Sequence, residues 1–183
     1  AEPEEIAGYM NEFFSRKDLV ASRSAIEQLL GDHGYAFANV NTISDIGEDA
    51  QRVDFVFAVD PGPLVYVRQI NISGNEATRD EVIRREVRQL ESSVFSAEKI
   101  RRSRERIRRL GFFDDVDIKT ASVPGAIDQV DLAISVKERA TGNFMFGTGY
   151  ADSDGLFLVA GAHRPNLFGT GRELSLEFEV SKI

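Results

Sequence analysis

An internal repeat constrains the fold of this chain more than any other feature of its sequence. The glycine-aromatic step Gly34-Tyr35 recurs 77 residues later as Gly111-Phe112. The apolar run at residues 53–59 recurs with the same offset at residues 130–136. Self-similarity at a fixed offset is typical of tandem structural units that each contain several short elements. The sequence therefore predicts two related domains in series.

The second copy, residues 64–139, contains a complete set of predicted elements. Alternating β-branched residues predict a strand over residues 65–73, which Gly74-Asn75 ends. Thr78, with Glu81 three residues later, has the spacing of a helix capping box. The further predicted features are an apolar helix stripe at Val82, Ile83, Val87 and Leu90, a helix from Ser96 to Gly111 with Ile107 inward, and strands at 116–118 and 129–137.

The first copy, residues 1–63, shows the same elements without an opening strand. We therefore expect a chain that begins inside a domain. Two prolines in the short link Pro61-Gly62-Pro63 restrict the backbone, so the two domains should have a limited range of relative angles. The predicted elements are helices over 4–14 and from Ser15, and strands near 36–43 and 52–59.

Residues 140–183 follow a different period. The aromatic residues Phe144, Phe146 and Tyr150 alternate with mostly small residues at 145–151. Residues 174–180 alternate between apolar residues and acidic or small ones. Alternating segments of about ten residues, joined by turns, are typical of outer-membrane β-barrel strands. The alternative is a soluble antiparallel meander that packs its apolar face on a core. No helix follows to cover that face, and three strands cannot close a barrel, so we expect a truncated barrel.

Composition excludes several classes of function. The 183 residues include no cysteine and two distant histidines, His33 and His163, so neither a zinc site nor a hydrolytic triad is expected. The runs at 147–149 and 169–171 do not continue as a dinucleotide-binding motif. The formal net charge of −8 argues against a dedicated nucleic-acid binder. We therefore expect no enzyme activity, no cofactor and no metal.

One predicted helix is crowded with arginines, and two interpretations of it remain open. It could be a face that binds phosphate, RNA, a lipid headgroup or a protein. It could also be a solvated surface that nearby acids such as Glu98 and Glu105 balance. No run of aromatic residues for base stacking accompanies the arginines, which favours the solvated surface. The arginines are Arg101, Arg102, Arg104, Arg106, Arg108 and Arg109.

Several longer motifs resemble those of BamA-type outer-membrane protein insertases, a family with periplasmic POTRA repeats. They are Val65-Tyr66-Val67-Arg68, Arg84-Arg85-Glu86, Leu110-Gly111-Phe112-Phe113, the junction run at 136–142, Phe146-Gly147-Thr148-Gly149-Tyr150 and the turn at 166–171. The resemblance covers essentially the whole chain.

The resemblance implies an α+β fold class. Each POTRA repeat has the order β-α-α-β-β, with a three-stranded mixed sheet packed on two helices, and antiparallel strands of a truncated transmembrane β-barrel follow. Residues 1–63 would be a fourth-like POTRA domain without its first strand. Residues 64–139 would be the complete fifth domain, and residues 140–183 the first three barrel strands.

The resemblance also implies a non-enzymatic role in the bacterial outer membrane, with the repeats in the periplasm. The repeats would dock accessory lipoproteins and guide unfolded outer-membrane proteins to a lateral gate in the lipid-embedded barrel. Glu91, in what the sequence indicates is an exposed loop without internal contacts, would bind a BamD-type lipoprotein. The candidate gate residues on the first barrel strand are Phe144, Phe146, Gly147, Gly149 and Tyr150.

Open sheet edges offer unpaired backbone groups to extended peptides, which suits a protein with many clients. The candidate positions for such client pairing are Val40, Val116 and Ile118. The same property predicts self-association of this chain through strand edges, and no nucleic-acid partner is expected. TamA-like proteins and secretion-partner transporters share the layout and remain alternatives, as does a soluble protein-binding adaptor.

Overall fold

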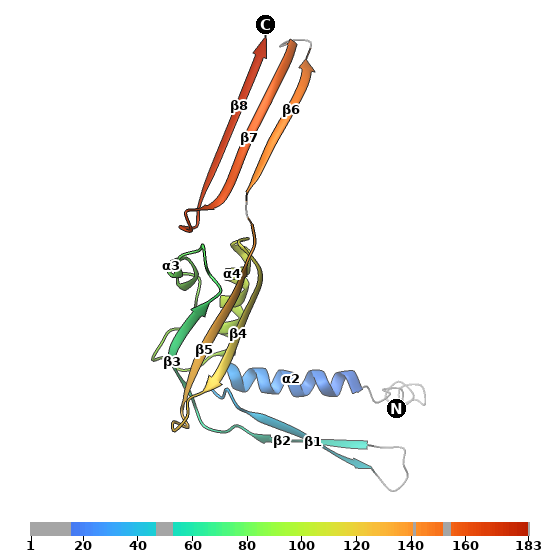
Figure 1. Cartoon of the computed structure of the whole chain (residues 1–183). Coiled ribbons are helices and arrows are strands. Elements are labelled where there is room, and N and C mark those ends of the chain that lie inside the picture. The colour runs from blue at the N-terminus through green and yellow to red at the C-terminus, as the bar shows by residue number, and fades with distance from the viewer. Residues whose placement is uncertain (1–15, 47–52, 141, 152–154, 183) are drawn as a thin grey trace, which may run out of the picture.

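The computed structural model describes residues 16–46, 53–140, 142–151 and 155–182. These residues form three regions along an elongated molecule (Figure 1). A helix and a two-stranded sheet lie at one end, a mixed sheet with two helices lies in the middle, and a separate three-stranded sheet extends from it. The predicted helix over residues 4–14 lies outside the described residues.

The first region contains α2 (Arg16–Asp32), β1 (Asn39–Ile46) and β2 (Val53–Asp60). The two strands pair antiparallel. Along α2, Val20 and Leu29 are 59% and 60% exposed. The described residues do not cover these two apolar side chains.

The middle region contains β3 (Tyr66–Ser73), α3 (Asp80–Arg84), α4 (Ala97–Arg109), β4 (Phe113–Ser122) and β5 (Gln129–Glu138). The strand order is β3-β5-β4, with β3 parallel and β4 antiparallel to β5. This is the mixed three-stranded sheet that the resemblance implied. The core lies between this sheet and the two helices. Its fully buried side chains include Val65, Val67, Ile83, Ile107, Val116, Val130, Leu132 and Ile134.

Local sequence explains α4 well and α3 less well. The Ser96 side chain accepts a hydrogen bond from the backbone N–H of Lys99, so it caps α4 as predicted. Gly111 ends that helix at a φ of 75°. The capping box predicted at Thr78 is wrong, because α3 begins at Asp80 after an Arg79 without side-chain capping. Leu90 was also predicted to be buried, yet it is 67% exposed because α3 ends at Arg84.

The third region contains β6 (Asn143–Ala151), β7 (Gly155–Leu167) and β8 (Arg172–Lys182) in the antiparallel order β6-β7-β8. The strand register places Phe146, Ala160 and Phe178 in one row across the sheet. The neighbouring row is Gly147, Val159 and Glu179. One face is therefore apolar. The other face is mixed: β6 contributes glycines and β8 contributes acidic residues, but β7 places Val159 and Phe157 between them.

The first and middle regions contact each other through α2 and the link. The backbone N–H of Val65 donates to the carbonyl of Gly34 at 3.0 Å. A Cβ on Gly31 would lie 3.0 Å from the Cβ of Ala97, so α2 and α4 approach closely there. Gly62 adopts a φ of 65° between its two prolines. These contacts support the expectation of a restricted angle between the two repeats.

Candidate functional site

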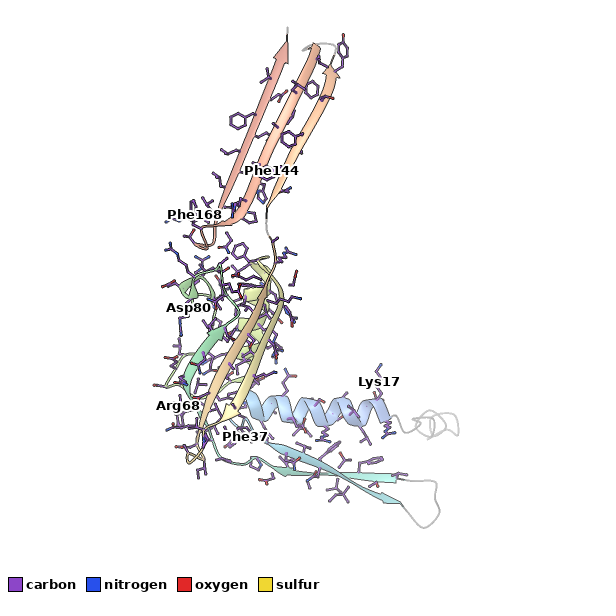
Figure 2. All side chains as sticks on the ribbon, viewed as in Figure 1. Lys17, Phe37, Arg68, Asp80, Phe144 and Phe168 are labelled. Atoms are coloured by element: carbon purple, nitrogen blue, oxygen red, sulfur yellow. The ribbon has the colours of Figure 1, made fainter. Side chains whose placement is uncertain are left out.

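The strand β6 has one neighbour, β7, and its other edge is open among the described residues. Three of its predicted gate residues are highly exposed: Phe144 is 79%, Phe146 is 81% and Tyr150 is 74% exposed. Figure 2 shows the side chains of β6–β8 projecting with no layer of described residues over them. The strand therefore presents both an apolar face and an unpaired backbone edge.

The two predicted gate glycines differ in their surroundings. A Cβ on Gly149 would lie 2.3 Å from the ring of Phe157, its cross-strand partner, so the missing side chain makes room for that ring. A Cβ on Gly147 would have no neighbour within 4 Å. A larger residue at 149 would therefore require the Phe157 ring to move, whereas space does not require glycine at 147.

The edge of β4, where client pairing was predicted, is bonded to side chains of its own domain. The N–H of Val116 donates to Asp115 Oδ1 at 2.9 Å, and its carbonyl accepts from Arg108 Nη2 at 3.5 Å. The carbonyl of Ile118 accepts from Arg104 Nη2 at 3.1 Å. The premise of free backbone groups at these positions is therefore wrong. Client pairing at Val116 and Ile118 stays a prediction, and it requires displacement of these contacts.

Val40, the third candidate for client pairing, lies on β1 opposite Val59. Its side chain is fully buried. The side chains of Val116 and Ile118 are also buried, at 1% and 7% exposure. A client could therefore meet the backbone at these three positions but not their side chains, and pairing at Val40 also stays a prediction.

Glu91 lies beside the outer edge of β3. Its Oε1 accepts a hydrogen bond from the backbone N–H of Ile70 at 2.8 Å. Arg84 Nη2 donates to the backbone carbonyl of Ile70 at 3.1 Å, and Arg84 Nη1 lies 3.7 Å from Glu91 Oε1. The expectation that Glu91 has no internal contact is therefore wrong. Nevertheless its side chain is 47% exposed, so a partner can still reach the carboxylate.

The turn between β7 and β8 docks on the segment that leads into α3. Asn166 Nδ2 donates to Thr78 Oγ1 at 2.7 Å, and the carbonyl of Gly169 accepts from the N–H of Arg79 at 3.0 Å. A Cβ on Gly169 would lie 1.9 Å from the carbonyl oxygen of Ala77. Any other residue at 169 would therefore displace the turn. These contacts join the third region to the middle one.

Glu138, at the end of β5, fixes the other side of this docking segment. Its carboxylate accepts hydrogen bonds from the N–H groups of Ala77 at 2.8 Å and Thr78 at 2.7 Å. Burial alone raises the pKa of Glu138, but its hydrogen bonds with Thr78 and Ala77 outweigh that effect, so its pKa lies below the ordinary value. The docking segment is thus held by an ionised carboxylate at neutral pH.

The sequence motifs contained Glu138 and Asn166, but no pattern indicated that they act together. Their roles depend on a contact between residues 61 and 88 positions apart in the chain. A usable signal was present in the turn: Asn166 precedes two glycines, Gly169 and Gly171, both with positive φ. Such a turn brings its backbone unusually close to a neighbouring surface.

A bidentate pair joins the outer faces of β3 and β5. Arg68 donates from Nε to Asp131 Oδ1 at 2.8 Å and from Nη2 to Asp131 Oδ2 at 2.5 Å. The hydrogen bond from Arg68 lowers the pKa of Asp131 below its ordinary value. The β3–β5 register shifts between Val67 and Gln69, so the pair lies at an irregularity of the sheet. It links two strands, and Gln69 Nε2 also donates to Asp131 Oδ2 at 3.5 Å.

Among the described residues, no group of three or more His, Asp or Glu side chains is placed to hold a metal ion. Within the same residues, no helix has the length and apolar character needed to span a membrane. The chemistry that this surface offers is therefore backbone pairing at β6, hydrogen bonding at the docked turn, and charge at the faces of the middle domain.

Comparison with known proteins identifies similar chains. The POTRA family model, described as "Surface antigen variable number repeat", matches residues 4–62 and 65–139. The outer membrane protein assembly factor BamA of Neisseria meningitidis serogroup B is 38% identical over 170 residues, which cover 93% of this chain and 21% of that protein. The BamA of Nitratidesulfovibrio vulgaris is 30% identical over 167 residues, with coverages of 91% and 21%.

Among solved structures, the crystal structure of BamA from Haemophilus ducreyi lacking POTRA domains 1-3 is similar to this chain with a TM-score of 0.81 and 36% identity. The match covers 92% of this chain and 32% of that one. The chain thus spans about a fifth of the length of the two BamA proteins that it matches, 21% of each.

Proposed function

The chain belongs to the BamA family of POTRA-containing outer-membrane protein assembly factors, and from this premise we propose that it forms the junction at which such a factor passes unfolded clients from periplasmic repeats to its barrel. Proteins of this family lie in the outer membrane, with the POTRA repeats in the periplasm. The proposed role is non-enzymatic. Pairing with the backbone of an open strand tolerates many client sequences, which suits a general assembly factor.

We assign residues 1–63 to the fourth POTRA domain of the whole protein, residues 64–139 to the fifth, and residues 140–183 to the first three barrel strands. The similarity over 92% of this chain to a BamA that lacks POTRA domains 1-3 supports this assignment. The antiparallel sheet β6-β7-β8, with one apolar face and one mixed face, supports the barrel assignment.

The open edge of β6 is the observation that carries the proposal. Both edges of the middle sheet are bonded to side chains or loops of their own domain, whereas the outer edge of β6 has no partner among the described residues and lies next to exposed aromatic side chains. A client strand that pairs with β6 would gain backbone hydrogen bonds and place its apolar side chains on the apolar face. We therefore propose β6 as the template strand.

Disulfide crosslinking in the full-length protein tests this role. The 183 residues contain no cysteine, so a single cysteine placed in them reports one position once any cysteines elsewhere in the full-length protein are replaced. We would place them at Thr148 on β6 and at Leu158 on β7, which lie opposite each other in the register. Each variant is paired with a stalled client that carries cysteines along its terminal strand.

We expect Thr148→Cys to form a client disulfide and Leu158→Cys to form almost none, because β7 is flanked on both sides. Equal crosslinking at both positions would contradict templating by β6 and would indicate nonspecific contact with the apolar face. Absence of crosslinking at β6 in an otherwise active protein would overturn the proposal.

We further propose that Glu91 contacts a BamD-type accessory lipoprotein. Its half-exposed carboxylate beside Arg84 supports a charge-assisted contact with a partner arginine. Because Glu91 also accepts from the N–H of Ile70, a useful variant must keep an acceptor. Glu91→Gln keeps one and removes the charge, whereas Glu91→Lys removes both.

We expect both Glu91 variants to bind the lipoprotein more weakly, Glu91→Lys by at least about tenfold. The melting temperature should fall slightly for Glu91→Lys and stay unchanged for Glu91→Gln. An Arg→Glu change on the partner should restore binding of Glu91→Lys if the two side chains pair directly. Unchanged binding by both variants would show that Glu91 serves only the β3 edge.

A further inference from the structure

We propose that a basic groove beside α4 binds an acidic segment of a protein partner. The groove has a volume of about 510 Å³. Five of its six lining side chains are basic and one is acidic. The lining residues are Arg88, Lys99, Arg102, Glu105, Arg106 and Arg109.

Four of these cations form a line on one face of α4. Lys99, Arg102, Arg106 and Arg109 follow one another at intervals of three or four residues, the spacing that places helical side chains on a common face. With a rise of about 1.5 Å per residue, the line is roughly 15 Å long. An acidic segment whose carboxylates recur about once per helical turn matches this line in charge and spacing.

The charges of the groove are only partly balanced within the chain. Arg88 and Lys99 form no ion pair among the described residues. On a chain with a net charge of −8, this leaves a local positive excess that faces solvent. The internal pairs are Arg102–Glu98, Arg106–Glu86 at 2.6 Å and Arg109–Glu105 at 3.6 Å.

The direction of α4 favours a protein segment over a lipid surface. At the start of α4, Ala97 lies against Gly31 of the first repeat. Just beyond its end, the carbonyl of Gly111 accepts from Arg139 Nε at 2.7 Å, next to the junction with β6. The groove therefore runs along the middle domain, away from the β6–β8 sheet. A membrane at the level of that sheet would meet only the Arg109 end, whereas an elongated protein segment can meet the whole line.

This surface is separate from the one proposed for the lipoprotein. The cavity beside Glu91 is lined by Ile70, Arg84, Val87, Gln89, Leu90 and Glu91, and it shares no residue with the groove. Binding at the groove can therefore fail or succeed independently of the proposed role of Glu91 and of strand templating by β6.

A binding assay with a designed probe tests the proposal. The probe is a fluorescein-labelled helical peptide with glutamates at i, i+3, i+7 and i+10, and its isomer carries the same glutamates in one contiguous run. The whole chain in a non-ionic detergent is titrated into each by fluorescence anisotropy. The groove variant is Lys99→Gln/Arg102→Gln/Arg109→Gln, which leaves Arg106 and its contact with Glu86 intact.

A charge-matched control variant, Arg101→Gln/Lys119→Gln/Lys137→Gln, removes three cations from outside the groove. We expect the groove variant to weaken binding of the spaced peptide about tenfold or more and the control variant by less than about twofold. The contiguous isomer should bind more weakly than the spaced peptide, and added salt should weaken both. Circular-dichroism melting checks that both variants stay folded.

Three outcomes would overturn the proposal. The first is no binding of the spaced peptide to the wild-type chain. The second is an equal loss of binding in the two triple variants, which would indicate general electrostatic attraction. The third is groove-dependent binding to phosphatidylglycerol vesicles without groove-dependent binding to the peptide, which would assign the surface to a membrane.

Discussion

The middle and third regions each contain a three-stranded sheet, but the outer edges of the two sheets differ in their contacts. In the middle region, Arg104 and Arg108 bond to outward carbonyls of β4, and Glu91 accepts the outward N–H of Ile70 on β3. In the third region, neither β6 nor β8 has such a contact along its outer edge among the described residues. Charged side chains at an edge are a common way to prevent unwanted strand pairing. Among the described residues, the edge positions of the middle sheet are thus bonded within their own domain, whereas the outer edges of β6 and β8 have no partner.

The same contrast extends to the cores. The mixed sheet of the middle region covers its apolar face with α3 and α4, and Ile107 and Leu132 are 0% and 1% exposed there. The third region has no second layer in the described structure, and Phe178 is 63% exposed. The middle domain can therefore be stable by its own packing, whereas the third region needs lipid, further strands or a client.

The strongest test of this contrast replaces one apolar side chain in each region. Ile107→Ala removes a fully buried side chain between α4 and the sheet and should cost about 2–4 kcal/mol of the free energy of unfolding. Phe178→Ala should change the unfolding of the middle domain by less than about 0.5 kcal/mol, because surface sites rarely matter more. Urea unfolding of both variants, followed by far-UV circular dichroism, measures the difference. Similar costs would mean that the third region belongs to the same cooperative unit.

The contrast in packing was visible in the sequence, because it depends on period. A period of two residues specifies the apolar face of the strand that carries Phe144, Phe146 and Tyr150. The helical spacing of apolar residues specifies the apolar face of the helix that carries Ile107. The closed edges were not visible. They depend on hydrogen bonds between side chains and strand residues that are distant in the chain. Arg104 bonds a strand residue 14 positions away, and Glu91 bonds one 21 positions away. Neither the local period nor the composition predicts such contacts.

The arginine helix shows the same limit at finer scale. The sequence favoured a solvated face on which any arginine could change, and exposed Arg102 fits that expectation at 65% exposure. Arg106 does not, because Glu86, its partner at 2.6 Å, is only 15% exposed. Periodicity places both arginines on one helix, but only the position of Glu86, in the segment after α3, distinguishes them.

A second prediction uses this pair. Arg106→Gln should cost about 1–2 kcal/mol of the free energy of unfolding, because the largely buried carboxylate of Glu86 loses its closest charged partner. Arg102→Gln should cost less than about 0.5 kcal/mol. The matched measurement is thermal unfolding of the two variants in the same buffer. If the double variant Arg106→Gln/Glu86→Gln regained most of the lost stability, the stranded carboxylate would be identified as the cause.

A third prediction concerns the open edge itself. We expect the whole chain to self-associate through β6 and β8, and Thr148→Lys on β6 should weaken that association several-fold, since a lysine on an edge strand opposes pairing. Thr120→Lys on β4 should leave it unchanged, because side chains of the same domain already bond the edge of β4. Sedimentation velocity in a non-ionic detergent measures both. An equal effect of the two lysines would show that association does not depend on the open edge.

The smallest expected effect lies at the contact between the two regions, where Glu138 holds the N–H groups of Ala77 and Thr78. Because the pKa of Glu138 is lowered in the folded chain, its contribution is complete above the unfolded-state pKa of about 4.3 and is lost as the pH falls through the lower, folded-state pKa. We therefore expect the docked turn to stay in place at pH 7 and to loosen only as the pH falls below the ordinary range of a glutamate pKa.

Spin labels at Glu81→Cys and Phe168→Cys would report this loosening as a broader distance distribution at low pH. Both side chains are exposed, on the α3 side and the turn side of the contact. In a Glu138→Gln background the distribution should be slightly broader already at pH 7 and should lose its dependence on pH, because the amide keeps one acceptor but cannot titrate. If the labelled wild-type chain and the Glu138→Gln chain respond to pH alike, another titratable group controls the contact, and Glu138 is not the source of its pH dependence.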